Sequence, residues 1–219
     1  MKNNTALFCL IALTAFMATS CSTAYYNVME TFGVEKRDML QNHVQAIRDI
    51  QEKVQNHFSS ALDYYLAVVS IKGGELEKKY RKLNKEYDLS EKEVERLEDK
   101  VERFNKVSKD LMKEWKKELK QYSNKDLRDA SARKRKETGA KLDKLLAGMN
   151  QSLAATKPVL TQLHDQVLFL KHNLNSQAIS GLQQESERIK SDVQKVITSM
   201  QASIQESQAF IDEMGLLDK

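Results

Sequence analysis

The apolar residues of this chain recur at alternating intervals of four and three over most of its length. That spacing places them on one face of an α-helix, and its repetition over many turns makes a heptad seam that packs against other helices. No stretch alternates apolar and polar residues with the period of two that a half-buried strand shows. The 219 residues include only 7 glycines and 1 proline, so few positions interrupt a helix. The pattern predicts an all-α fold of long helices.

The first two helices are predicted on either side of a glycine pair. The first helix follows Gly33, and its seam breaks the apolar rule only at Gln51. Gly73 and Gly74 are expected to end it in a reversal, because adjacent glycines weaken a helix and readily adopt its C-terminal cap conformation. The second helix is predicted over residues 75–122, without a break.

The third helix is predicted to begin after a turn, with Ser123 or Asn124 as its cap. Over residues 125–141 the seam is weak, because Lys134 and Lys141 fall where apolar residues are expected. Packing should therefore be loose at this end of the helix.

From residue 142 to residue 174 the third helix keeps strict spacing. Pro158 lies within it, so the helix either kinks there or restarts with the proline in its first turn. Residues 167–169 add apolar side chains beside the seam and should be covered on several sides. A turn at residues 173–176 then leads to the last helix. Its expected seam, with one stutter after Val193, consists of Ile179, Leu182, Ile189, Val193, Ile197, Met200, Ile204 and Ile211.

All three predicted connections are short, and short connections favour antiparallel neighbours. We therefore expect residues 34–219 to form one elongated antiparallel bundle, or coiled coil, of about four long helices.

The first 21 residues have the features of an export signal. Lys2 is followed by an apolar run over residues 6–18, and small residues stand directly before Cys21. The run is too short to cross about 30 Å of hydrocarbon, so residues 1–20 are expected to be a cleaved signal peptide. The small residues before Cys21 resemble the lipobox of bacterial lipoproteins, in which the cysteine is acylated and becomes the N-terminus.

The mature chain would then be attached to a membrane through the lipid on Cys21. Residues 21–33 form the expected juxtamembrane segment. By analogy with lipoprotein sorting in Gram-negative bacteria, Ser22 after the cysteine favours the periplasmic face of the outer membrane. The other cysteine, Cys9, leaves with the signal peptide, so no disulfide is expected.

The sequence offers no candidate active site. It contains no glycine-rich phosphate loop and no Gly-x-Ser-x-Gly elbow. His164 and His172 are eight residues apart, and His43 and His57 are fourteen apart, whereas a helical metal pair prefers three or four. We expect no enzymatic activity, no cofactor, no metal and no small-molecule substrate.

The charge along the chain is uneven. Residues 113–146 contain twelve Lys or Arg against six Asp or Glu, including the consecutive Arg133, Lys134, Arg135 and Lys136. In an exported protein nucleic acid is excluded as a partner, so this run would contact anionic lipid headgroups, lipopolysaccharide phosphates or an acidic protein. The alternative is an ordinary solvated face.

The predicted second helix is longer than the first, which leaves part of its seam without an evident partner in the chain. Uncovered apolar stripes favour association. Phe104, Leu111 and Trp115 are therefore candidate anchors for self-association or for a partner helix. The alternative is that the third helix and its neighbours bury all three.

Several short motifs resemble one bacterial family. They are Cys-Ser-x-Ala-Tyr-Tyr at 21–26, Phe-Gly-x-Glu-Lys-Arg-Asp at 32–38, Gly-Gly-x-Leu-Glu at 73–77 and Val-Leu-Phe-Leu-Lys-His-Asn-Leu-Asn at 167–175. Together they resemble a lipoprotein family known only as a domain of unknown function, over nearly the whole mature chain. The resemblance implies an envelope lipoprotein with coiled-coil character and supplies no reaction.

Two functions remain open on the sequence. One is a membrane-anchored cell-envelope lipoprotein with a structural or partner-binding role. The other is a membrane-active or anionic-lipid-binding bundle that uses the basic run.

Overall fold

The computed structural model describes residues 36–70, 75–174 and 176–216. The predicted signal peptide, the lipidation site Cys21 and the reversal at Gly73 and Gly74 lie outside these residues. The chain divides into two units, Met1–Leu40 and Gln41–Lys219. The packing below is that of the described part of the second unit.

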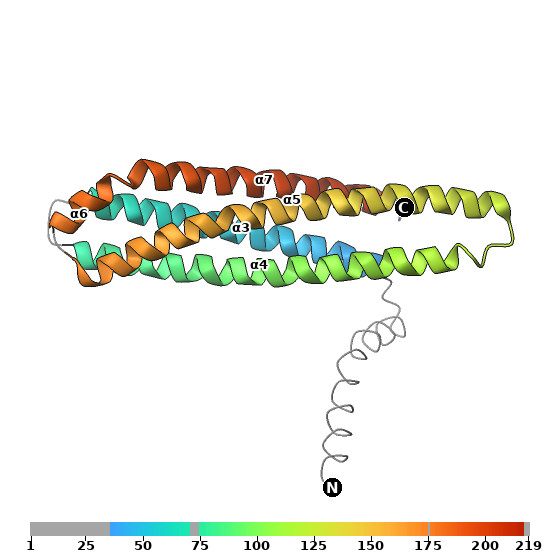
Figure 1. Ribbon diagram of the computed structural model, residues 1–219, viewed down its shortest axis with the longest axis horizontal. Coiled ribbons are helices and arrows are strands. Elements are labelled where there is room, and N and C mark those ends of the chain that lie inside the picture. Colours follow the sequence, from blue (N-terminus) through green and yellow to red (C-terminus); the bar gives the residue numbers. More distant parts are fainter. Residues whose placement is uncertain (1–35, 71–74, 175, 217–219) are drawn as a thin grey trace, which may run out of the picture. The chain divides into compact units, whose positions relative to one another are not determined.

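The described residues form helices and contain no strand, which confirms the all-α prediction (Figure 1). The helices, in chain order, are α3 (Lys36–Val69), α4 (Leu76–Glu118), α5 (Lys125–His172), α6 (Ser176–Gln183) and α7 (Ser186–Leu216). α4 is continuous over the region of Asp88, as predicted. α5 packs against both α4 and α7.

Side-chain contacts between the helices show that neighbours run antiparallel. Between α3 and α4, His57 Nδ1 lies 2.8 Å from a Glu86 carboxylate oxygen. Between α5 and α7, Gln162 Nε2 donates to Asp192 at 3.0 Å. Further contacts give the direction. Lys79 Nζ of α4 donates to the Ala67 carbonyl oxygen of α3 at 3.3 Å, and Lys144 of α5 lies 3.2 Å from Glu206 of α7, so partner numbers fall along one helix as they rise along the other.

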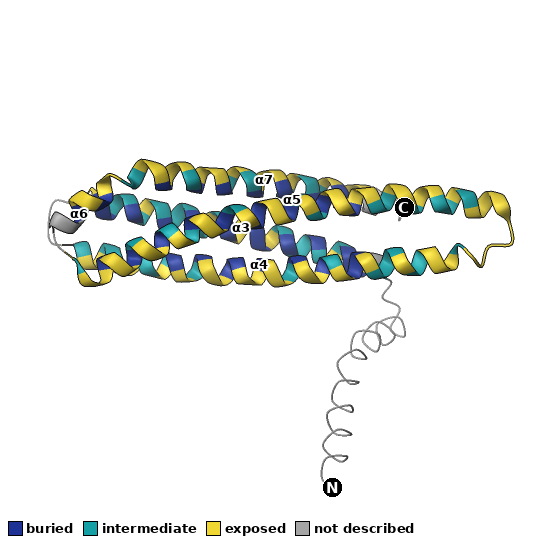
Figure 2. Cartoon of the chain, viewed as in Figure 1, coloured by how far each residue is buried: buried dark blue, intermediate teal, exposed yellow. Residues whose placement is uncertain are grey.

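The seam predicted for the first helix is buried throughout the second unit. The side chains at its eight positions from residue 44 to residue 68 have 0% exposure, and they are Val44, Ile47, Gln51, Val54, Phe58, Ala61, Tyr65 and Val68. Figure 2 shows the buried residues on the inner faces of the helices and the exposed ones outside. Burial of this apolar stripe is the main stabilising contribution of α3.

Gln51, the one polar residue in that seam, forms a buried polar layer across three helices. Its Nε2 donates to Ser152 Oγ of α5 and to Ser203 Oγ of α7, both at 2.9 Å. Ser152 Oγ in turn donates to the Met149 carbonyl oxygen at 2.8 Å. The Gln51 Oε1 atom has no hydrogen-bond partner among the described residues. The layer fixes which residues of the three helices stand at one level.

The N-cap of α5 and the position of Pro158 within it decide between alternatives that the sequence left open. Asn124 is its N-cap, since its side chain accepts hydrogen bonds from the backbone N–H groups of Asp126 and Leu127 at 2.9 and 3.1 Å. Pro158 lies inside the helix, which does not restart there. The proline removes one backbone donor and leaves the helix on both sides intact.

The last predicted helix is wrong in two respects. It is divided in two, because residues 184 and 185 form a turn between α6 and α7. Its seam also continues without a stutter, at alternating steps of four and three, through the buried residues Ile189, Val193, Val196, Met200, Ser203, Ser207 and Phe210. Ile197, Ile204 and Ile211 flank this face and are only half-buried.

Tyr65, near the C-terminal end of α3, holds α6 in place. The Tyr65 hydroxyl donates to the Leu182 carbonyl oxygen at 2.8 Å. Burial, followed by the nearby negative charge of Glu185, raises the pKa of Tyr65 to about 12. The hydroxyl therefore remains protonated and able to donate at any physiological pH.

The apolar run near the end of α5 is not covered on several sides, contrary to the prediction. Val167 is buried, whereas Leu168 is 50% exposed and Phe169 is 43% exposed. Successive residues of a helix are turned by about 100°, so three in a row cannot all face the same two neighbours. Among residues 167–170, only Val167 and Leu170 are buried in the core.

Candidate functional site

α4 and α5 extend beyond α7 as a two-helix arm, which we define as residues 109–141 and whose base, at Lys141, still contacts Glu213 of α7 (Figure 1). No residue of the arm is buried, whereas Ser108 and Leu142 at its base are. A pair of helices has one contact face on each member, so most of its surface meets solvent. The loose packing predicted for residues 125–141 is confirmed.

Hydrogen bonds between side chains and between a side chain and the backbone join the helices of the arm. Trp115 Nε1 of α4 donates to Ser131 Oγ of α5 at 2.9 Å. Arg135 Nε of α5 donates to the Met112 carbonyl oxygen of α4 at 3.0 Å. These contacts hold the two helices at a defined separation.

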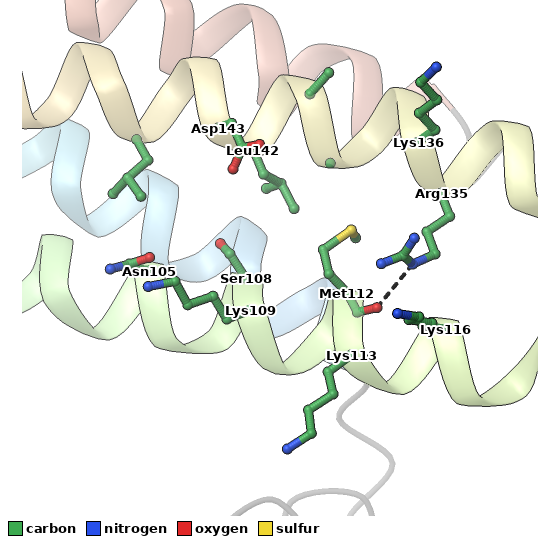
Figure 3. Close-up of a pocket in the computed structure, with 13 residues that line it drawn as sticks. Asn105, Ser108, Lys109, Met112, Lys113, Lys116, Arg135, Lys136, Leu142 and Asp143 are labelled. Carbon is green, nitrogen blue, oxygen red and sulfur yellow. Dashed lines mark hydrogen bonds between the residues drawn. The ribbon is translucent and has the colours of Figure 1, made fainter.

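An elongated groove of about 760 Å³ lies between α4 and α5 and extends from the arm to its base. Figure 3 shows Ser108, Met112 and Leu142 directed into the space between the helices, while Lys113 and Lys136 extend away from it. The groove is lined by Asn105, Ser108, Lys109, Met112, Lys113, Lys116, Arg135, Lys136, Gly139, Ala140, Leu142, Asp143 and Leu146.

The lining of the groove is cationic. It contains five basic side chains and one carboxylate, that of Asp143. No carboxylate oxygen of the described residues lies within ion-pair distance of Lys109, Lys113 or Lys116. Some lysines elsewhere are paired, for example Lys144 with Glu206 at 3.2 Å, whereas others on α4, such as Lys106 and Lys117, have no ion pair within the described residues either. The groove therefore presents uncompensated positive charge.

The base of the arm is tied to α7 by an ion pair. Lys141 Nζ contacts the carboxylate of Glu213. The hydrogen bond from Lys141 and then the charges of Lys141 and Lys134 lower the pKa of Glu213 below its usual value. Lys134 thus lies close to acidic charge and outside the groove lining.

The structure separates the four consecutive basic residues proposed as an anionic contact. Arg135 and Lys136 line the groove, whereas Arg133 and Lys134 are exposed elsewhere on α5. The groove adds three lysines of α4 that the sequence analysis did not identify: Lys109, Lys113 and Lys116. Their spacing of four and three, which places them on one helix face, was the available signal.

The three candidate docking residues lie in different environments. Phe104 has 0% exposure and belongs to the core, so it cannot serve as a docking anchor in this fold. Leu111 and Trp115 are half-buried, and Trp115 contacts Ser131 on the other helix of the arm. Two apolar residues at the tip are more exposed: Tyr122 at 41% and Leu127 at 58%.

Two other kinds of site are absent from the described part of the chain. No three His, Cys, Asp or Glu side chains within it gather as metal ligands would. None of the helices described there is both long and apolar enough to span a bilayer.

The fold and the groove define an all-α antiparallel bundle with a basic two-helix arm. The chain belongs to the family described as a protein of unknown function (DUF2959), whose model matches residues 25–214. The family resemblance noted in the sequence is thereby confirmed. A comparison with curated proteins finds no match.

Proposed function

We propose that this protein is a membrane-anchored cell-envelope lipoprotein with a structural or partner-binding role and without catalytic activity. The observation that carries the binding role is the two-helix arm, which projects beyond α7 with every residue at least partly exposed. The small residues before Cys21 and the apolar run that precedes them support the anchor.

The arm suits a binding role because no third helix of the described residues covers its apolar side chains. Leu111 and Trp115 are half-buried, and Leu127 is more than half exposed. In the part where α3, α4, α5 and α7 pack together, which we call the four-helix part, seam positions such as Leu97 and Leu163 have 0% exposure. A partner helix laid along the arm would complete the same heptad packing, through the helix-in-groove mode of recognition.

Replacement of the anchor residue tests the first half of the proposal. We expect Cys21→Ser to move the protein out of the mature membrane-bound fraction, because serine cannot form the thioether that carries the lipid. Cell fractionation and the electrophoretic size of the product measure this. A Cys9→Ser variant is the control and should be processed and anchored as the natural chain is. Unchanged anchoring and processing of Cys21→Ser would refute the lipoprotein assignment.

Photocrosslinking in cells tests the partner-binding role. A photoreactive residue at Leu127 or Tyr122 should yield a discrete crosslinked product, because these side chains are exposed on the arm. The same residue at Asn150, which is exposed on α5 in the four-helix part, should not. Mass spectrometry of the product distinguishes a second copy of this chain from a different protein. Equal, diffuse crosslinking at all three positions would contradict a docking arm.

A second candidate function is binding of an anionic lipid surface, and the uncompensated lysines of the arm favour it. Exposed charges are screened beyond about 8 Å at physiological salt, so such binding would weaken strongly as salt is raised. Vesicles containing anionic lipid are its direct test, and they enter the experiment below.

A further inference from the structure

The groove of the arm differs in chemistry between its inner surface and its rim. The inner surface is mostly apolar or small, with Met112, Gly139, Ala140, Leu142 and Leu146, and it also carries the hydroxyl of Ser108. The rim carries ammonium groups that extend away from the space between the helices, as Figure 3 shows for Lys113 and Lys136. We propose that the groove binds one anionic lipid molecule, with its acyl part along the inner surface and its phosphate at the lysines.

The size of the groove fits such a ligand. Pockets that hold small molecules and cofactors generally measure about 300–1,000 Å³, and this groove measures about 760 Å³. Its length follows α4 from Asn105 to Lys116, which suits an extended chain better than a compact anion. Gly139 keeps the α5 wall low, since an added Cβ there would meet only Met112 Sδ, at 3.5 Å.

The charges select the headgroup. Lys109, Lys113 and Lys116 have no carboxylate of the described residues at ion-pair distance, so a phosphate would be their first close anion. Lysine places a compact charge on a flexible stem and can swing toward a headgroup at the rim. Arg135, by contrast, is bonded to the Met112 carbonyl oxygen and maintains the spacing of the helices.

The apolar lining distinguishes a lipid from a bare phosphate. A site for inorganic phosphate would surround it with several fixed donors, whereas the rim lysines here are long and exposed. Acyl contacts with Met112 and Leu146 would supply the remaining affinity. This inference rests on the second candidate function and narrows it to one molecule in one groove.

Calorimetric titration of the full chain tests it with three probes. Monomeric dihexanoylphosphatidylglycerol should bind in a one-to-one ratio. Dihexanoylphosphatidylcholine, which has the same chains but no net charge, should bind at least about tenfold more weakly. Inorganic phosphate should produce no saturable heat at the same concentrations. Equal binding of the two lipids, or binding of phosphate as tight as that of the anionic lipid, would overturn the proposal.

Two matched triple variants separate the groove from general surface charge. Lys109→Gln, Lys113→Gln and Lys116→Gln together should weaken dihexanoylphosphatidylglycerol binding by at least about tenfold. The control replaces three exposed lysines of the same segment that are absent from the groove lining, as Lys106→Gln, Lys117→Gln and Lys120→Gln. It removes the same charge and should change the affinity by less than about threefold.

A substitution at Gly139 probes the acyl part without changing any charge. Gly139→Leu projects a side chain into the groove and should abolish lipid binding, while Gly139→Ala should retain it, because its Cβ makes only an ordinary contact. Both replacements raise helix propensity, so neither should unfold α5. Circular dichroism verifies this. Unimpaired lipid binding by Gly139→Leu would refute the placement of the chain.

Vesicles containing phosphatidylglycerol separate failure of the groove from failure of the second candidate function. If the natural chain binds vesicles and both lysine triples weaken that binding equally, surface attraction stands and the groove proposal is wrong. If neither vesicles nor monomeric lipid bind, both are wrong. Selective loss in the groove triple and in Gly139→Leu supports the groove. The apolar residues 6–18 are common to all variants, so differences between variants report on the arm.

Discussion

Phe104→Ala should lower the free energy of unfolding by about 3–5 kcal/mol, a large loss for a single substitution. Its ring has 0% exposure and lies one turn from the base of the arm, in line with the buried Val101 and Val107. Removal of the ring takes away its transfer free energy and leaves a cavity that packed helices close only partly. Urea unfolding followed by circular dichroism measures the change.

Phe169→Ala is the matched control for Phe104→Ala. It deletes the same ring from a position that is 43% exposed, and it should change stability by no more than about 0.5 kcal/mol. Similar losses for the two variants would mean that Phe169 is as well covered as Phe104. The sequence predicts that residues 167–169 are covered on several sides, and the structure contradicts this. Similar losses would support that prediction after all.

Gln51→Ala should lower the free energy of unfolding by about 2–4 kcal/mol, through a cavity and through loss of the donor shared by two buried hydroxyls. Gln51 Nε2 serves both Ser152 Oγ and Ser203 Oγ, so a single truncation affects three helices. The same unfolding experiment measures it.

Replacement of the whole polar layer should not show this loss in the free energy of unfolding. Gln51→Leu combined with Ser152→Ala and Ser203→Ala removes the unpaired Gln51 Oε1 along with its neighbours and nearly keeps the packed volume. Replacing all partners by apolar groups is typically neutral or stabilising, so this triple variant should be at least as stable as the natural chain. A triple variant no more stable than Gln51→Ala would show that the layer stabilises the bundle on balance.

The sequence predicted the helices well where apolarity alone decides which face is buried. In α3 every predicted seam position from Val44 to Val68 is buried. In α7 the same rule selected Ile204 and Ile211, yet Ser203 and Ser207 are the buried residues. Ser203 is buried with a partner, since its hydroxyl accepts a hydrogen bond from Gln51 Nε2 in the polar layer. A pattern of hydrophobicity does not show which polar side chains find a buried partner.

Only part of the candidate site could be predicted from the sequence. The consecutive basic residues on α5 were evident, but the groove exists because the turn at residues 119–124 folds α4 back against α5. That fold brings Lys113 within the same lining as Arg135, although they are more than twenty positions apart. Which faces of two helices meet depends on packing angles that charge counts do not contain.

The partial exposure of the whole arm also affects how the molecule opens. Hydrogen bonds of a segment with little buried apolar surface break in local fluctuations, at a free energy well below that of global unfolding. The arm can therefore fray from its tip toward Leu142 while the core around Phe58 and Gln51 stays closed. A ligand or partner that joins α4 to α5 would suppress this fraying and add order mainly at that end. Amide exchange rates along the chain would then record occupancy of the arm separately from the stability of the bundle.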